Sequence, residues 1–183
     1  MNEINQLVEY HSQWEQAVIT SAEDCVSNAI RLYDTQFSYT SKGARIQIFI
    51  DKLDDEWGSP NIEDCEQFSR LLHLKLESLE TLQGSPEFYV LEVSSPGAER
   101  PVRSMEEFSR FQKLPIKLQV LNEDGKRKDI VVQVLKIEES SLKVSLADVK
   151  FNRNQGLLKK KAKAEEFTLN YSDIIVAKLH LDF

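Results

Sequence analysis

The sequence predicts an α+β protein of two domains, an N-terminal two-layer α/β domain and a C-terminal small β-barrel. The chain has 183 residues, which is long for one small domain and sufficient for two. Hydrophobic residues make up 41% of the chain and charged residues 29%, which is typical of a folded protein with an ordinary core. After Phe111 the pattern changes from long amphipathic segments to short strands and tight turns, which indicates a second kind of domain.

The first expected element is an amphipathic helix over residues 2–27. A second helix-start signal at Ser21 either breaks this helix or extends it. Its apolar side chains recur at three- and four-residue spacing and are Ile4, Leu7, Val8, Tyr10, Trp14, Ala17 and Val18. Two strands at 30–39 and 45–51 follow, and the turn residues 41–43 between them predict an antiparallel hairpin. Alternation in the second strand gives it one buried face, formed by Ile46, Ile48 and Ile50.

A second helix is expected after Asn61, which is placed to cap it, while Glu63 and Asp64 in its first turn complement the helix dipole. A continuous apolar stripe along this helix would cover the sheet, formed by Ile62, Cys65, Phe68, Leu72, Leu76 and Leu79. A third strand at 88–94 completes the order α-β-β-α-β, and residues 1–103 are the predicted N-terminal domain.

Residues 115–183 are the predicted C-terminal domain, joined to the first by a hinge at 104–114. Residues 122–125, Asn-Glu-Asp-Gly, are a hairpin signal between two of its strands. Five short strands predict a small barrel of the SH3 or Sm kind, at 116–121, 130–137, 142–146, 167–170 and 175–181. Closure of a barrel removes exposed strand edges.

Charge divides the chain into two halves of opposite sign. The whole sequence has a net charge of −7. Residues 1–100 contain 7 Lys and Arg against 18 Asp and Glu, whereas residues 101–183 contain 16 against 12. The negative net charge of the whole chain disfavours nucleic acid as a partner, but the positive net charge of the second half does not.

Catalytic patterns are lacking in the sequence, so an enzyme is not expected. The three histidines, His11, His73 and His180, lie in different expected elements without metal-ligand spacing. Cys65 and His73 are eight residues apart on one helix, about 12 Å along its axis, too far for a nucleophile–base pair. The glycines form no phosphate-binding loop. No catalytic, cofactor-binding or metal-binding residue is predicted.

The two cysteines indicate an intracellular protein with free thiols. Cys25 and Cys65 have no CxxC spacing, and Cys65 falls on the apolar stripe, so we expect it in the core. The first twenty residues lack the positive region of a signal peptide, and no apolar run approaches a membrane span. A soluble cytoplasmic protein is therefore expected.

Residues 91–102 contain a turn with two possible roles. Pro96 and Gly97 fit the central positions of a type II turn, and Pro101 holds Arg100 in an extended backbone. The segment is either a strand end with an interdomain turn, or a site where Arg100 binds phosphate or carboxylate beside the hydroxyls of Ser94 and Ser95.

The same segment carries a family resemblance. Residues 89–102, Tyr-Val-Leu-Glu-Val-Ser-Ser-Pro-Gly-Ala-Glu-Arg-Pro-Val, closely resemble the signature of the RimP family of bacterial ribosome maturation factors. A second block agrees with it, Ile-Phe-Ile-Asp-Lys at 48–52 followed by Ile-Glu-Asp-Cys-Glu-Gln-Phe-Ser-Arg at 62–70. Residues 174–179 look like the closing strand of the family.

This resemblance implies an N-terminal α/β domain, a C-terminal SH3-like barrel and a role in late assembly of the small ribosomal subunit. It implies binding to the immature particle, where the factor helps small-subunit protein twelve, near the decoding centre, and the adjoining rRNA to settle. It implies no catalytic step, no cofactor and no membrane. We expect a monomer.

The basic clusters of the second half are the first candidates for contact with the particle. Their members are Lys126, Arg127 and Lys128 after the hairpin turn and Lys159, Lys160, Lys161 and Lys163 in a long basic segment. Each cluster is either a solvated loop or a contact for rRNA phosphates.

The acidic first half suits a basic ribosomal protein and repels bare RNA. The family resemblance instead implies a protein-twelve contact on the barrel, so the domain that carries this contact stays open. Asp51, Glu66, Arg70 and Arg100 lie at element ends and would form a polar surface beside Ser94 and Ser95, or else a structural acid–arginine network that pins the third strand. Phe49 is either a platform for a base or packs under the N-terminal helix, and the second is favoured.

Two other function classes remain. An Sm-like RNA-binding module would require an oligomeric ring. An SH3-like adaptor that reads peptides would require an aromatic-lined groove, for which residues 116–183 offer few aromatic side chains.

Overall fold

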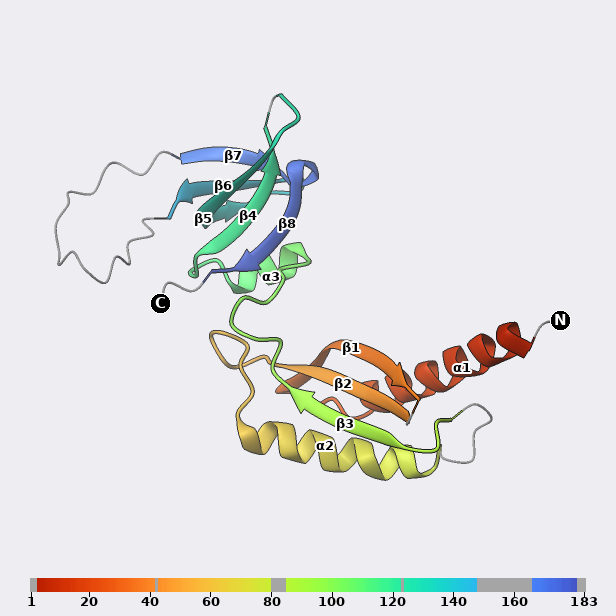
Figure 1. Ribbon diagram of the computed structural model, residues 1–183. Helices are drawn as coiled ribbons and strands as arrows, with labels where there is room; N and C mark the ends of the chain where they lie inside the picture. The colour runs from red at the N-terminus through yellow and green to blue at the C-terminus, as the bar shows by residue number, and fades with distance from the viewer. Residues whose placement is uncertain (1–2, 42, 80–84, 123, 148–165, 181–183) are drawn as a thin grey trace, which may run out of the picture. The chain divides into compact units, whose positions relative to one another are not determined.

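The computed structural model describes residues 3–41, 43–79, 85–122, 124–147 and 166–180 (Figure 1). The chain divides into two compact units, Met1–Pro96 and Gly97–Phe183. The expected boundary after residue 103 differs from this division. Residues 101 and 102 pair with the last strand of the second unit, where the Val102 amide donates to the Ala177 carbonyl at 2.9 Å.

The first unit has the element order predicted from the sequence. It consists of α1 (Glu3–Glu23), β1 (Ile30–Thr40), β2 (Gly43–Lys52), α2 (Ile62–Glu77) and β3 (Tyr89–Ser94). Helix α1 continues through Ser21 and ends four residues before the expected end, so the second start extends the helix. The strands form a sheet of order β1-β2-β3, antiparallel between β1 and β2 and parallel between β2 and β3. Parallel neighbours need a long crossover, which α2 supplies.

Both helices pack on the same face of this sheet. Trp14 and Val18 of α1 and Phe68 and Leu72 of α2 form one core with the predicted buried face of β2, namely Ile46, Ile48 and Ile50. Cys65 packs against this core as expected. Two expectations were wrong. Ile62 is 82% exposed, and Phe49 alternates with the buried isoleucines, so it lies on the face of β2 opposite the helices.

The second unit is a five-stranded antiparallel sheet with one short helix. It consists of α3 (Met105–Arg110), β4 (Ile116–Leu121), β5 (Arg127–Ile137), β6 (Ser141–Leu146), β7 (Glu166–Asn170), the 3-10 turn η1 (Tyr171–Asp173) and β8 (Ile174–Leu179). The strand order is β7-β6-β5-β4-β8. No ladder joins β7 to β8 within the described part of the chain, so the sheet has two edges where a closed barrel would have none.

Residues of the expected hinge belong to the core of the second unit. Phe108 of α3 and Phe111 after it are fully buried, and Leu114 is 6% exposed. Ser104 caps α3 by accepting a hydrogen bond from the Glu107 amide at 3.2 Å. Because aromatic burial fixes α3 against the sheet, residues 104–114 are an ordered part of this unit.

Candidate functional site

Gly97 lies in the segment for which the sequence predicts a type II turn. Gly97 has a φ of +86°, the value that the second central position of a type II turn requires and that only glycine adopts without strain. Ser94 is exposed at the end of β3 and Ser95 is half-buried after it. Ser94 is therefore accessible to solvent.

Arg100 is not on the surface. Its side chain is 1% exposed, and its Nη2 lies 3.0 Å from Oε1 of Glu107, which is also nearly buried. The guanidinium carbon lies 5.0 Å from the ring centroid of Phe111. The other oxygen of Glu107 accepts a hydrogen bond from the Arg103 amide at 2.6 Å. This pair ties residues 100–103 to α3, and its geometry supports a structural role for Arg100.

Three of the other predicted polar residues, Asp51, Glu66 and Arg70, form ion pairs within the first unit. Asp51 is fully buried, and its Oδ2 lies 3.7 Å from Nη2 of Arg31, its cross-strand neighbour on β1. Glu66 and Arg70 form an i,i+4 ion pair of 2.5 Å on the exposed side of α2.

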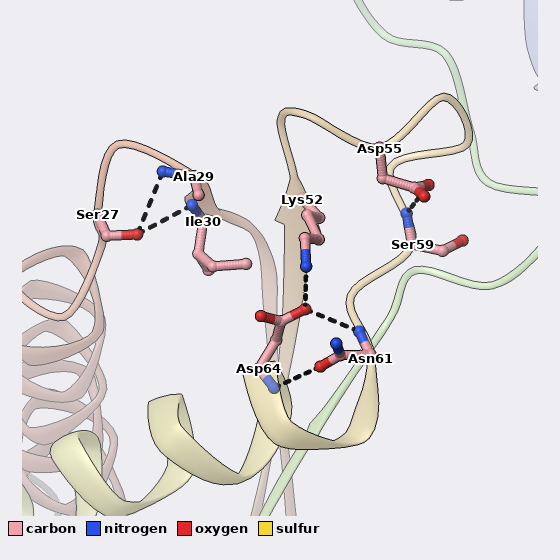
Figure 2. A network of polar contacts seen from close by, with 8 residues as sticks. All are labelled: Ser27, Ala29, Ile30, Lys52, Asp55, Ser59, Asn61 and Asp64. Carbon is pink, nitrogen blue, oxygen red and sulfur yellow. Dashed lines mark hydrogen bonds and ion pairs between the residues drawn. The ribbon is translucent and has the colours of Figure 1, made fainter.

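A polar network joins the end of β2 to the start of α2 (Figure 2). Asn61 and Asp64 form a capping box, in which the Asp64 amide donates to Oδ1 of Asn61 at 2.8 Å and the Asn61 amide donates to Oδ2 of Asp64 at 2.9 Å. Lys52 at the end of β2 donates to the same oxygen of Asp64 at 2.8 Å. The hydrogen bond from Lys52, with that from the Asn61 amide, lowers the pKa of Asp64.

The predicted cap is thus present, and it includes a partner that sequence reasoning missed. Lys52 is twelve residues from Asp64, and only the fold brings them together. Asp55 in the intervening loop accepts hydrogen bonds from the amides of Trp57 and Ser59 at 2.9 and 2.8 Å. The Asp55 carboxylate therefore stabilises the backbone of the loop in which it lies.

The basic cluster after the hairpin turn is fully on the surface. Lys126, Arg127 and Lys128 are exposed where β5 leaves the turn, at the projecting end of β4 and β5 (Figure 1). Oδ1 of Asn122 accepts a hydrogen bond from the Lys126 amide at 2.7 Å, which fixes the turn. Lys159, Lys160, Lys161 and Lys163 lie outside the described residues.

Two lysines that sequence reasoning missed lie on the same sheet as this cluster. Lys117 of β4 and Lys178 of β8 are direct cross-strand neighbours, and both are exposed. They are 61 positions apart in the sequence, and no periodicity relates them. Only the register of β4 against β8 places them together.

The described residues hold no group of three His, Cys, Asp or Glu that could bind a metal ion. Cys25 and Cys65 are free thiols, as expected, and burial raises the pKa of both. None of the described helices combines the length and the hydropathy that crossing a membrane requires.

Comparison with known proteins agrees with the motifs quoted above. Residues 22–99 match the RimP N-terminal domain, and residues 101–180 match a family described as a domain of unknown function (DUF7912). The chain is 37% identical over 122 residues to the ribosome maturation factor RimP of Leptospira biflexa serovar Patoc, covering 66% of this chain and 72% of that protein. It is 28% identical over 159 residues to the RimP of Leptospira interrogans serovar copenhageni, covering 86% and 90%. The chain therefore belongs to the RimP family of ribosome maturation factors.

Proposed function

We propose that this protein binds the immature small (30S) ribosomal subunit and assists its late assembly without catalysing a reaction. The family acts in maturation of the small subunit and is non-enzymatic. The observation that carries the proposal is the 37% identity to a RimP protein over 72% of that protein's length. Cytoplasmic location and a monomeric state are parts of the same proposal.

The fold of the second unit supports a finer assignment, an SH3-like rolled sheet. Its edge strands β7 and β8 are consecutive and are connected by the three residues of η1 alone. The edges of a flat five-stranded sheet lie roughly 19 Å apart at about 4.8 Å per strand. Three residues of 3-10 helix advance only about 6 Å. The sheet must therefore curl to bring the end of β7 close to the start of β8.

The charge distribution supports a division of labour between the units. Exposed basic residues in the second half offer contacts for rRNA phosphates, whose interaction with Lys and Arg depends strongly on salt. The excess of acidic residues in the first half suits a basic ribosomal protein and repels bare RNA. A particle that exposes both rRNA phosphates and a basic protein surface could bind both halves of the chain.

Co-sedimentation tests the proposal. Tagged protein is mixed with purified immature small subunits, mature small subunits and whole ribosomes, and each mixture is resolved on a sucrose gradient. We expect the protein to travel with immature small subunits and to remain at the top of the gradient with whole ribosomes. Equal sedimentation with all three particles, or with none, would contradict a role in assembly.

Solution mass distinguishes the alternative of an Sm-like module. A chain of 21.1 kDa that acts as a monomer gives a single species of that mass in light scattering. A ring of several copies would favour the Sm-like alternative over the proposal.

A further inference from the structure

We propose that the outward face of β4, β5 and β8, centred on Lys117 and Lys178 and extending to Arg127, is the surface that contacts rRNA phosphates. This inference rests on the proposed function and adds the residues that carry the contact. The register of β4 against β8 identifies Lys117 and Lys178, and Arg127 belongs to the basic cluster after the hairpin turn.

The first observation is a pair of like charges placed directly opposite each other. In the antiparallel pairing of β4 and β8, Lys117 is the partner of Lys178. Such neighbours have Cβ atoms about 4.5–5.5 Å apart, and like charges at these positions destabilise a sheet. Lys117 pairs with Asp129 at 3.2 Å, whereas Lys178 has no ion pair with any described carboxylate. An external anion would relieve this repulsion.

In a second cross-strand lysine pair on the same sheet, carboxylates of the protein itself neutralise both charges. Lys136 of β5 and Lys143 of β6 are also direct cross-strand partners. Each has its own carboxylate: Lys136 lies 2.9 Å from Glu138, and Lys143 lies 2.7 Å from Glu166. Among the described contacts Lys117 has Asp129 and Lys178 has no carboxylate partner, so of these two lysine pairs it is Lys117 and Lys178 that retain an unbalanced positive charge.

The third observation is that strand alternation extends the charged surface. Ile116, Leu118 and Val120 of β4 are buried, so Lys117, Gln119 and Leu121 face outward. Register places Arg127 beside Leu121 and Val176 beside Gln119 on this outward side. From Lys117 to Leu121 the strip is about 13 Å long at about 3.3 Å per residue.

The chemistry of the strip favours phosphate over bases. Its neighbouring residues are lysine, arginine, glutamine, leucine, valine and the single acid Asp129, and none has an aromatic ring on which a base could stack. Lysine acts on phosphate as a point charge and carries no sequence information. The strip should therefore bind the RNA backbone independently of sequence.

Paired charge-neutralising variants of the full-length protein test this assignment. Binding to purified immature small subunits is measured for the wild type, for Lys117→Gln/Lys178→Gln and for the matched control Lys136→Gln/Lys143→Gln, at several salt concentrations. Each lost phosphate contact lowers the slope of log affinity against log salt by about 0.7–0.9. We expect the first variant to lower the slope by about 1.4–1.8 and the control to change it by less than about 0.3.

The outcomes separate the inference from the proposed function. If the wild type binds immature subunits and both variants keep its slope, the strip is not the contact surface and the proposed function stands. If the control loses as much slope as the Lys117/Lys178 variant, the effect is one of overall charge and the inference is overturned. If the wild type does not bind, both fail. Circular dichroism melting of each variant shows whether lost binding reflects lost folding.

Discussion

Arg100 is a buried residue within the motif that resembles the family signature. Its position just after the Pro96-Gly97 segment invites a role in ligand binding, but its side chain is 1% exposed and paired with Glu107. Burial of an ion pair is costly, and removal of one partner leaves the other charge buried and uncompensated. The burial of this pair favours a structural role for Arg100, which the following substitution tests.

Replacement of Arg100 by Ala should therefore lower stability. We expect a loss of about 3–5 kcal/mol in the free energy of unfolding, because the Glu107 carboxylate would remain buried without its partner. Urea denaturation followed by circular dichroism measures it, with Arg70→Ala on the exposed side of α2 as the control. Unchanged stability with lost binding to immature subunits would instead make Arg100 a contact residue.

Gly43 is a second residue whose identity is fixed by its surroundings. It has a φ of +143°, and a Cβ built on it would lie 2.2 Å from the carbonyl oxygen of Phe88. That carbonyl accepts a hydrogen bond from the Ala44 amide at 2.9 Å, which starts the pairing of β2 with the chain leading into β3. The close approach of the two backbones leaves no room for a side chain.

Gly43→Ala should accordingly destabilise the protein by about 2 kcal/mol or more, because both the backbone strain and the clash must be relieved. Gly125→Ala is the matched control, since Gly125 has a φ of +71° but open space around the Cβ position. A comparison of thermal melting curves gives the difference. Equal losses would mean that strain alone acts and that the contact with Phe88 is irrelevant.

At the scale of elements, the start of α2 depends on its capping box and on Lys52. The hydrogen bond from Lys52 is the main cause of the lowered pKa of Asp64. A group with a depressed folded-state pKa stabilises the fold above its ordinary pKa and loses that contribution as pH falls through the folded value. The stabilisation is thus complete above about pH 4 and is lost in more acidic solution.

Asp64→Asn should remove this pH dependence. We expect the difference in melting temperature between wild type and variant to be largest near neutral pH and to shrink as pH falls from about 5 to 3. Glu56→Gln in the exposed loop before α2 is a suitable control. A difference that stays constant over this range would mean that the amide replaces the carboxylate equally well in both protonation states.

The elements themselves were largely predictable from the sequence. Hydrophobic periodicity and turn residues located α1, α2 and the described strands to within a few residues, because these signals are local. Helix α3 lies within the segment expected to be a hinge. The predicted surroundings of Ile62 and Phe49 were wrong, because residue spacing gives the side of an element on which a side chain lies but not whether another element covers that side. The pairing of Lys52 with Asp64 and of Lys117 with Lys178 depends on tertiary register, which no local pattern encodes.

At the scale of the whole molecule, the net charge of −7 conceals two halves with different chemistry. The two-domain organisation and the family were predictable, because the composition shift and the long motifs are contiguous in the sequence. The candidate phosphate surface was only partly predictable: the cluster at 126–128 is contiguous, whereas its continuation across β4 and β8 is assembled by strand pairing.

The basic segment at 159–163 lies outside the described residues, and its sequence predicts contacts with rRNA phosphates. Replacement of Lys159, Lys160, Lys161 and Lys163 by Ala should flatten the salt dependence of binding to immature subunits by two or more units, at about 0.7 per phosphate contact. Measurement of affinity between low and moderate salt checks this. A slope equal to that of the wild type would identify the segment as a solvated loop.

The parallel pairing of β2 with β3 has a consequence for the order of folding. The β1–β2 hairpin joins residues that are close in sequence, whereas Gln47 and Glu92, which meet across β2 and β3, are 45 positions apart. Closing the longer loop costs more chain entropy and is slower. Amides of β1 should therefore gain protection in pulsed hydrogen exchange before those of β3, so that during synthesis the hairpin can form while the third strand is still inside the ribosome.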